Sequence, residues 1–268
     1  MQIKLICSDI DGTLLNKDRE LSTNTLTQIK RLAPIPFILI SSRMPKAMLH
    51  LQKELEIAHL PIIAYNGGLI LADNKIVSST EISSSTSEAI VDFCKDTNLH
   101  ISLYHNDEWY VPELDYWANR EANNTKVTPT IQDIKMTLSK WKSENRGAHK
   151  IMIMGDADEI NSLVDYIDKN LADEVIGYRS KDTYLEIAHK SISKKTAIKT
   201  LIEHQYPKIR FNNILAFGDN YNDIEMLKSV GVGVAVANAK PKVLVIADEV
   251  TDSNKEDGVA NYLKNIYK

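Results

Sequence analysis

The sequence predicts an α/β fold, in which a doubly wound parallel sheet forms one domain and an inserted α+β domain interrupts it. At both ends of the chain, near-continuous apolar runs of strand length alternate with helical segments, which indicates a parallel sheet covered on both faces. In the middle, strand follows strand. A length of 268 residues leaves room for two separate cores. We therefore assign residues 1–82 and 190–268 to a core domain and residues 83–189 to the insertion.

The N-terminal part predicts strands and helices in turn. The first helix is indicated by Leu26, Ile29 and Leu32 at helical spacing behind Ser22 or Thr23 as the capping residue. The expected elements are a strand over 3–8, a helix over 21–32, a strand over 36–41, a helix from Pro45 to about Leu55 and a strand over 61–65 that Gly67 and Gly68 end.

The same alternation returns near the C-terminus, whereas the middle has a different order. The expected C-terminal elements are a helix over 196–204, a strand over 213–218, a helix over 222–230 and a strand over 232–237. The serine-rich stretch 78–88 has the composition of a linker. The insertion is expected to contain a helix over 86–97, two strands within 100–111, a helix over 131–143, a strand over 149–155, a helix over 156–171 and strands over 174–180 and 183–189.

Composition narrows the classes of partner. The net charge of -4 provides no basic field for nucleic acid. The only cysteines, Cys7 and Cys94, are far apart and do not have metal-ligand spacing, so we expect neither a disulfide nor a zinc site, and we expect Cys7 to be buried and unreactive. The N-terminal apolar run is too short for a signal peptide or a membrane span. We expect a cytoplasmic protein without a nucleic-acid or membrane partner, and no protein partner is indicated.

Two aspartates follow the first predicted strand. Because side chains alternate along a strand, Asp9 and Asp11 are expected on one side of its carboxyl end, where open parallel sheets bind ligands. Like charges this close either divide their roles or hold a metal ion. Gly12 allows a sharp turn directly afterwards. A strand that ends in a polar turn remains the alternative for this pattern taken alone.

A second acidic cluster follows the predicted strand over 213–218. Asp219 and Asp223 are expected at the end of this strand and in the first turn of the next helix, at the same edge of the sheet as Asp9. Mg²⁺ prefers oxygen ligands in near-octahedral geometry, which carboxylates at neighbouring strand ends supply. The second cluster alone is typical of a capped loop, but the two together predict a metal site.

These residues resemble four motifs of the haloacid dehalogenase (HAD) superfamily of phosphohydrolases, whose core is Rossmann-like, and specifically of its Cof-type phosphatases with a large C2-type cap. In order along the chain, the motifs are "DIDGTLL" (9–15), "ILISSR" (38–43), "LEIAHKSISKKTAI" (185–198) and "GDNYNDIEML" (218–227). The stretches "AYNGG" (64–68), "AVANA" (235–239) and "EDGVANYL" (256–263) are also similar. The inserted domain resembles the cap more in position and size than in sequence.

The resemblance implies a role for each acid. Asp9 would attack phosphorus and form an aspartyl-phosphate. Asp11 would donate a proton to the leaving group and later accept one from water, which requires a pKa nearer neutrality than that of Asp9. Mg²⁺ would be held by Asp9, by the backbone carbonyl of Asp11 and by Asp219, with Asp223 close by.

The resemblance also implies phosphate ligands. Lys194 and the Ser41 hydroxyl would bind the transferring phosphoryl group, although Lys194 alone could equally be a solvated charge at a helix start and Ser41 a helix cap. Ser42, Arg43 and Asn222 would contact phosphate or substrate, with capping and surface pairing as the alternatives. Two further asparagines in the similar stretches are expected to hold turns; these are Asn66 and Asn238.

Two positions depart from the family pattern. Ser42 stands where glycine is frequent in T-G-R, and Lys195 follows the catalytic lysine where glycine is frequent; we expect Lys195 to face solvent. His189 is expected to be an exposed loop residue. Several aromatic residues of the insertion could stack on a substrate but fit a hydrophobic core better, namely Tyr104, Trp109, Tyr110, Tyr116 and Trp117.

Together these features predict a Mg²⁺-dependent phosphatase that hydrolyses a small phosphorylated metabolite, with sugar phosphates as the leading class. The inserted domain is expected to select the substrate. A phosphosugar mutase on the same core is one alternative, and it would return the phosphoryl group to an acceptor other than water. A catalytically silent regulator that binds phosphorylated metabolites is the other.

Overall fold

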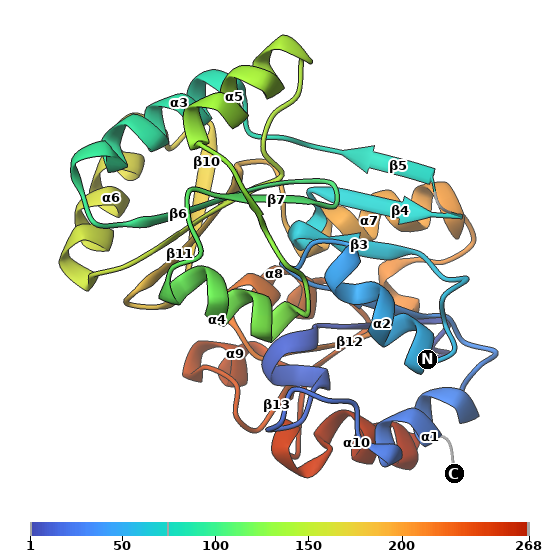
Figure 1. Ribbon diagram of the computed structural model, residues 1–268. Coiled ribbons are helices and arrows are strands. Elements are labelled where there is room, and N and C mark those ends of the chain that lie inside the picture. Colours follow the sequence, from blue (N-terminus) through green and yellow to red (C-terminus); the bar gives the residue numbers. More distant parts are fainter. Residues whose placement is uncertain (1, 74, 267–268) are drawn as a thin grey trace. The chain divides into compact units, whose positions relative to one another are not determined.

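The computed structural model describes residues 2–73 and 75–266 of the chain (Figure 1). These residues form two compact units. Unit 1 takes its described residues from Met1–Ser78 and Ser193–Lys268, and unit 2 is Ser79–Ile192. The chain therefore passes between the units a few residues from the positions expected from the sequence.

Unit 1 is built on an eight-stranded sheet in the order β14-β13-β12-β1-β2-β3-β4-β5. The pairs from β14 to β3 are all parallel, so the predicted α/β class is confirmed. Strand order reverses at β1, because β2 follows it on one side and β12 lies on the other; such a switch point is where open α/β sheets bind ligands. The strands are β1 (Leu5–Ser8), β2 (Phe37–Ile40), β3 (Ile62–Ala64), β4 (Leu69–Ala72), β5 (Lys75–Ser79), β12 (Ile214–Gly218), β13 (Val232–Val236) and β14 (Glu249–Thr251).

One edge of this sheet is antiparallel, which was not expected from the sequence. The chain turns back after β3, and β4 pairs with β3 antiparallel, with Ala64 opposite Leu69. The expected linker over 78–88 is also wrong in part. Strand β5 extends to Ser79, and Ser83 caps a helix of unit 2 by accepting a hydrogen bond from the amide of Thr86 at 3.1 Å. Serine is as suited to helix caps as to linkers, so composition alone did not separate the two.

The helices of unit 1 begin and end close to the expected positions. Ser22 caps the first by accepting a hydrogen bond from the amide of Thr25 at 3.0 Å. Helices α1 and α10 pack against each other, as do α7 and α8. Two helices near the C-terminus, α9 and α10, were not expected as elements. The helices are α1 (Thr23–Arg31), α2 (Lys46–Glu54), α7 (Lys194–Gln205), α8 (Ile224–Ser229), α9 (Pro241–Ile246) and α10 (Gly258–Ile266).

Unit 2 contains a six-stranded sheet in the order β10-β11-β9-β6-β7-β8. Its neighbouring strands pair antiparallel except β7 and β8, which are parallel. Helix α4 and the short strand β8 were not expected from the sequence. The elements are α3 (Ser84–Phe93), β6 (His100–His105), β7 (Glu108–Val111), α4 (Tyr116–Thr125), β8 (Thr130–Ile131), α5 (Ile134–Ser143), β9 (Lys150–Met154), α6 (Ala157–Asn170), β10 (Val175–Lys181) and β11 (Tyr184–His189).

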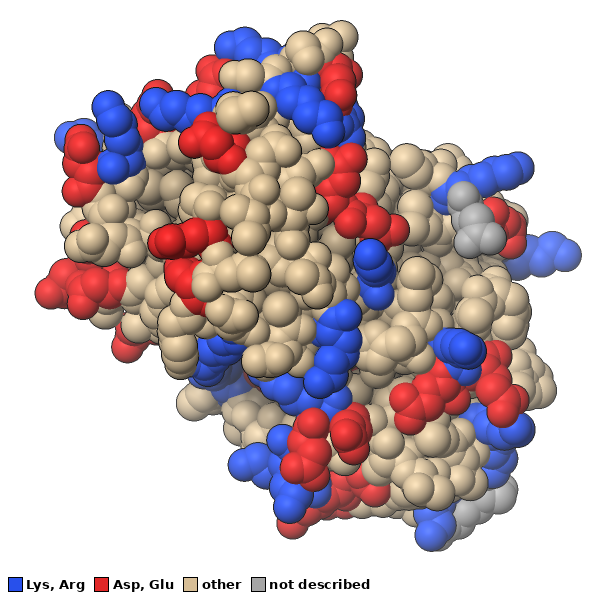
Figure 2. All heavy atoms as spheres, in the orientation of Figure 1, with Lys and Arg blue, Asp and Glu red and all other residues tan. Residues whose placement is uncertain are grey.

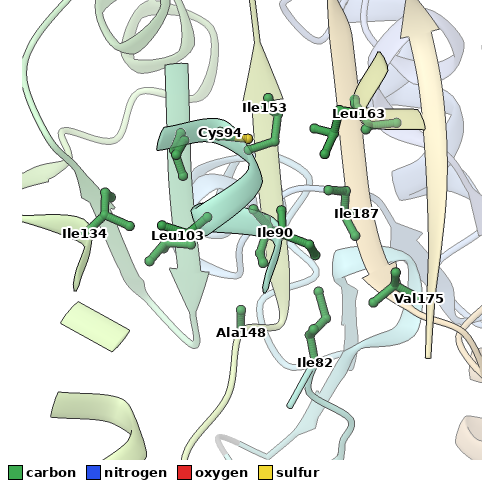
Figure 3. Packing of buried hydrophobic residues seen from close by; sticks show 14 of the residues in the cluster. Ile82, Ile90, Cys94, Leu103, Ile134, Ala148, Ile153, Leu163, Val175 and Ile187 are labelled. Atoms are coloured by element: carbon green, nitrogen blue, oxygen red, sulfur yellow. The ribbon is translucent and has the colours of Figure 1, made fainter. Parts of the chain in front are cut away.

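The hydrophobic core of unit 2 lies between its sheet and the helices α3, α5 and α6 (Figure 3). Alternate strand residues such as Leu103 and Ile153 meet helical residues such as Ile90 and Leu163. Among the aromatic residues singled out above, Tyr104, Trp109 and Tyr110 are buried, as expected of core residues, whereas Tyr116 is 66% exposed and Trp117 is half-buried.

Acidic and basic side chains are mixed on the surface. On the face shown in Figure 2, Lys and Arg lie among Asp and Glu, so that this face carries no extended field of one sign. Among the described residues, no helix combines the length and the apolar character that crossing a bilayer requires.

Candidate active site

The carboxyl ends of β1 and β12 bring three aspartates together in unit 1. The strands are parallel with Ser8 opposite Phe217, and the amide of Asp9 donates to the Phe217 carbonyl at 3.0 Å. Asp9 and Asp219 each follow the last residue of their strand. One carboxylate oxygen from each of Asp9, Asp219 and Asp223 lies within 4.8 Å of the others. The expected meeting of both acidic clusters at one sheet edge is therefore seen.

The loop after β1 lies against the side chain of Asp219. Gly12 adopts a φ of +86°, and a Cβ at this position would lie 2.6 Å from Asp219 Oδ2, so a larger residue would collide with the carboxylate. The Thr13 hydroxyl donates to Asp219 Oδ1 at 2.8 Å. Thr13 was not singled out from the sequence, although its fixed offset after Asp9 was a usable signal.

Lys194 lies in the first turn of α7 and is fully buried. Ser193 and Thr196 form a capping box that begins the helix at this point. The Lys194 ammonium donates to Asp9 Oδ1 and, at 2.6 Å, to Asp223 Oδ1. Burial alone would lower the pKa of Lys194, but Asp223 and Asp9 outweigh it and raise that pKa. The alternative of a solvated surface charge is therefore wrong.

Asp223 is also fully buried and has both oxygens engaged. Its Oδ2 accepts the backbone N–H groups of Asp219 and Asn220 at 2.9 and 3.0 Å, while Oδ1 accepts Lys194. Asp223 therefore fixes the loop that carries Asp219 and orients the ammonium.

Two of the clustered acids, Asp9 and Asp219, have raised pKa values. Burial raises the pKa of Asp9 well above its usual range; Lys194 opposes this shift, and Asp223 and Asp219 add to it. Burial, followed by the charge of Asp223, raises the pKa of Asp219 to about 7. The ionised forms of both acids are therefore disfavoured, and a bound cation would stabilise them.

Asp11 has a different environment from Asp9. Arg43, which is 5% exposed, donates from Nε to Asp11 Oδ2 at 2.7 Å and from Nη2 to Oδ1 at 2.8 Å, and Arg19 adds a contact at 3.4 Å. Partial burial would raise the pKa of Asp11, but Arg43 outweighs it and lowers that pKa. The expectation that Asp11 has the higher pKa of the two is therefore not met in this arrangement.

The phosphate-binding candidates after β2 also lie at this edge. Ser41 is buried, and its hydroxyl accepts the amide N–H of Arg43 at 3.2 Å. Ser42 is half-buried, and Lys195 is exposed as expected. Arg43 pairs with Asp11 rather than lying free at the surface.

Three asparagines join the loops of the site. Asn222 donates from Nδ2 to Asn66 Oδ1 at 3.0 Å, and Asn238 donates to the Gly12 carbonyl at 2.8 Å. Asn66 and Asn238 thus hold turns, as expected.

Two other singled-out residues have ordinary surroundings. Cys7 is fully buried, and burial strongly raises the pKa of its thiol, as expected of an unreactive cysteine. His189 ends β11 in unit 2, half-buried rather than exposed in a loop, and its Nδ1 accepts the amide N–H of Ser191 at 3.2 Å.

The donor set of the acidic cluster fits a hard divalent cation. Asp9 and Asp219 offer carboxylate oxygens whose pKa values are raised first by burial and then by neighbouring carboxylates, and oxygen ligands of this kind suit Mg²⁺. The side chain of Asp11 is directed to Arg43 instead, so only its backbone is a candidate ligand.

Comparison with known proteins identifies the family. A sequence model described as haloacid dehalogenase-like hydrolase matches residues 6–263. A Haemophilus influenzae protein named "Putative phosphatase" is 34% identical over 98% of this chain and 98% of its own length. A 5-amino-6-(5-phospho-D-ribitylamino)uracil phosphatase of Bacillus subtilis is 28% identical over 98% of this chain and 97% of its own.

A solved structure has the same fold over its whole length. This haloacid dehalogenase-like hydrolase from Bacteroides thetaiotaomicron has a TM-score of 0.88 and 27% identity, and the match covers 99% of this chain and 100% of that chain. The predicted family, its Cof-type branch and the expectation of an enzyme are therefore confirmed. The chain belongs to the haloacid dehalogenase-like hydrolases.

Proposed function

We propose that this protein is a Mg²⁺-dependent phosphatase that uses Asp9 as its nucleophile. The observation that carries the proposal is the placement of the Asp9 carboxylate at the sheet's switch point, between the buried Lys194 ammonium and the acidic pair Asp219 and Asp223. Phosphoryl transfer needs such a combination, because an anionic nucleophile must approach an anionic phosphate.

The proposed reaction has two displacements. An Asp9 carboxylate oxygen forms a bond to phosphorus while the bond from phosphorus to the leaving oxygen breaks, and Asp11 gives that oxygen a proton. Water then attacks the phosphorus of the aspartyl-phosphate, Asp11 takes a proton from this water, and the bond to Asp9 breaks to release inorganic phosphate. Arg43 favours the ionised form of Asp11, which suits the second displacement.

Positive charge reaches the phosphoryl group from two sources in this proposal. Mg²⁺, held by Asp9, Asp219 and the backbone of Asp11, would neutralise the repulsion between carboxylate and phosphate. Lys194 is the point charge on the other side of Asp9, and the Ser41 hydroxyl is a neutral donor for a phosphoryl oxygen. Ser42 and Asn222 are proposed as further contacts to phosphate or substrate.

We propose a small phosphorylated metabolite as the substrate, with sugar phosphates as the leading class. The relative named as a 5-amino-6-(5-phospho-D-ribitylamino)uracil phosphatase supports this class, because its substrate carries the phosphate on a sugar-derived chain. The two buried thiols, Cys7 and Cys94, suit a reducing compartment, so we place the reaction in the cytoplasm.

The test is release of inorganic phosphate from a panel of phosphomonoesters, with Mg²⁺ and with a chelator. We expect turnover only with Mg²⁺ and essentially complete loss in Asp9→Asn. Substantial residual activity in Asp9→Asn would exclude the nucleophile role. With a hexose 1-phosphate, formation of the 6-phosphate isomer in place of inorganic phosphate would identify a mutase instead. An inactive wild-type protein that still binds these esters would indicate a regulator.

A further inference from the structure

The turn Tyr65–Gly67, directly after β3, has an unusual backbone. Its three residues have φ values of 52°, 56° and 112°. The left-handed region is unfavourable for residues that carry a Cβ, and for a bulky residue such as Tyr65 it is an outlier. Such conformations persist when surrounding contacts hold them, and they concentrate at functional sites.

The first set of contacts joins this turn to the loop after β2. The amide of Tyr65 donates to the Arg43 carbonyl at 3.0 Å, and the amide of Asn66 donates to the Ser41 carbonyl at 2.8 Å. Both N–H groups therefore hold the backbone of the segment that carries the proposed phosphate ligand Ser41 and the partner of Asp11.

The second contact joins the turn to the loop after β12. Asn66 is 3% exposed, and its Oδ1 accepts the side-chain amide of Asn222 at 3.0 Å. Asn222 immediately precedes Asp223, which holds the Lys194 ammonium. The side chain of Asn66 therefore links two loops that are separated by more than half of the chain.

The third contact is a close approach to helix α7. A Cβ at Gly67 would lie 2.6 Å from the Cβ of Ala197 and 3.1 Å from the Ser193 carbonyl. The turn is therefore packed against the first turn of α7, in which Lys194 lies. A side chain at Gly67 would push this helix start away.

We infer that Asn66 is a positioning residue that sets the Ser41 loop and the Asn222 loop relative to each other, within a turn whose Gly67 packs against the start of α7. This inference rests on the proposed phosphatase function. The left-handed backbone of Asn66 directs its N–H group to the Ser41 carbonyl, and the Asn66 side chain accepts the amide of Asn222. Small displacements of groups that stabilise a transition state lower turnover strongly, so the effect belongs in kcat more than in KM.

Three variants separate the contributions. Asn66→Gly keeps the left-handed backbone accessible and removes only the hydrogen bond to Asn222. Asn66→Ala removes this hydrogen bond and also disfavours the left-handed backbone. Asn222→Ala removes the same hydrogen bond from its other end. Loss of one hydrogen bond should lower kcat about fivefold, and Asn66→Ala should lower it more than about tenfold because the backbone is also disfavoured. Asn222→Ala also removes a proposed substrate contact, so in the double variant Asn66→Gly/Asn222→Ala the loss should not exceed that of Asn222→Ala alone.

Asn145 provides a matched control in unit 2. It is an asparagine with a φ of 52° that is exposed on a turn. Asn145→Ala imposes the same backbone penalty on the folded protein and should leave kcat and KM unchanged. A reduced kcat in Asn145→Ala comparable to that in Asn66→Ala would show that general destabilisation explains the effect, and it would overturn the inference.

Orthovanadate provides a readout that does not need turnover. It mimics the transferring phosphoryl group, and its dissociation constant in the presence of Mg²⁺ is measured for each variant by calorimetry. We expect Asn66→Ala to weaken vanadate binding about tenfold and Asn145→Ala to leave it unchanged. Equal affinities in Asn66→Ala and wild type would overturn the inference. Absence of hydrolysis by the wild-type protein would contradict the phosphatase proposal alone, because vanadate binding still decides the role of Asn66.

Discussion

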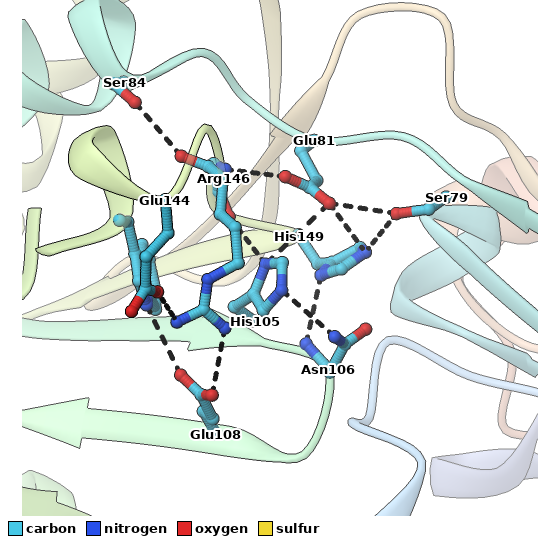
Figure 4. Close-up of polar contacts among 11 residues, drawn as sticks. Ser79, Glu81, Ser84, His105, Asn106, Glu108, Glu144, Arg146 and His149 are labelled. Atoms are coloured by element: carbon cyan, nitrogen blue, oxygen red, sulfur yellow. Dashed lines mark hydrogen bonds and ion pairs between the residues drawn. The ribbon is translucent and has the colours of Figure 1, made fainter. Parts of the chain in front are cut away.

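Each unit contains a buried polar cluster, and the two clusters are built from different groups. In unit 1, Lys194 lies between Asp9 and Asp223, so ionised groups compensate one another. In unit 2, His105 and His149 are buried beside Glu81, with one ring nitrogen of each 3.8 Å from Glu81 Oε1 (Figure 4). Both sets have ligand-type atoms within 4.8 Å of one another, but the unit 1 set offers three carboxylates, whereas the unit 2 set offers two imidazoles and one carboxylate.

Hydrogen bonds determine the tautomers in the unit 2 cluster. His105 Nδ1 lies 2.9 Å from the Gly147 carbonyl, which can only accept, so this nitrogen carries a proton. His149 Nδ1 accepts the backbone N–H of Asn106 at 3.1 Å, so the proton of the neutral ring is on Nε2. Burial, followed by His105, lowers the pKa of His149 to about 4, which keeps its ring neutral.

The two clusters present different kinds of atom at similar distances. In unit 2, the nitrogens that face Glu81 already carry protons, and a cation would have to displace them. In unit 1, the facing atoms are carboxylate oxygens, and burial followed by neighbouring charges raises the pKa values of Asp9 and Asp219. The chemical type of the facing atoms therefore distinguishes the two clusters where distances do not.

The largest expected effect is that of Lys194→Met. This change leaves Asp9 and Asp223 buried without their cation, which should lower the free energy of unfolding by about 3–5 kcal/mol in metal-free protein. Urea denaturation followed by circular dichroism measures this. Lys195→Met, at the exposed neighbouring position, should change it by less than about 0.5 kcal/mol. Equal stabilities of the two variants would mean that the unit 1 cluster is not held by charge.

The second effect is a pH dependence of unit 2. Because the pKa of His149 is about 4 when folded and 6.5 ordinarily, the unfolded chain binds the proton more readily. Stability is therefore full above pH 6.5 and falls as the pH drops toward 4, by on the order of 3 kcal/mol. All three tryptophans lie within 79–192, so tryptophan fluorescence during urea unfolding reports on this unit.

Matched histidine variants test the source of this pH dependence. His149→Gln should remove most of it, whereas His59→Gln, at an exposed position of unit 1, should retain it. If both variants keep the wild-type slope, the neutral-imidazole description of the unit 2 cluster is wrong.

The third effect is stabilisation by Mg²⁺. A cation that binds only the folded acidic cluster should raise the free energy of unfolding by about 2.7 kcal/mol at a concentration one hundred times its dissociation constant. Asp219→Asn should reduce this gain, and Glu81→Gln should leave it intact. Thermal unfolding at increasing Mg²⁺ concentration provides the measurement. A gain that depends on Glu81 instead would reverse the assignment of the two clusters.

The smallest effect is expected for Glu81→Gln itself. Glu81 Oε2 accepts the Gly147 amide at 2.6 Å and Oε1 accepts the Ser79 hydroxyl at 3.0 Å, and glutamine keeps one acceptor oxygen. Loss of one hydrogen bond should lower the stability of unit 2 by about 1 kcal/mol, measured by tryptophan fluorescence in urea. A loss as large as that of Lys194→Met would indicate that the unit 2 cluster also depends on ionic charge.

Local sequence patterns predicted much of unit 1. The apolar run before Asp9 and the cap at Ser22 each depend on neighbours in the chain, so short windows sufficed. The same windows missed β4, α4 and β8. Strand β4 pairs with β3 across a tight turn, and β8 has two residues, which is too short for a periodic signal.

By itself, the sequence determined which residues end the parallel strands, and hence that Asp9 and Asp219 meet at one edge of the sheet. Only the tertiary structure decided which charged side chains pair with one another. Lys194 reaches Asp9 across 185 positions of the chain, and Arg43 takes the Asp11 side chain. Periodicity reports on neighbours within one element, whereas burial and charge pairing, which set the pKa values, depend on residues that only folding brings together.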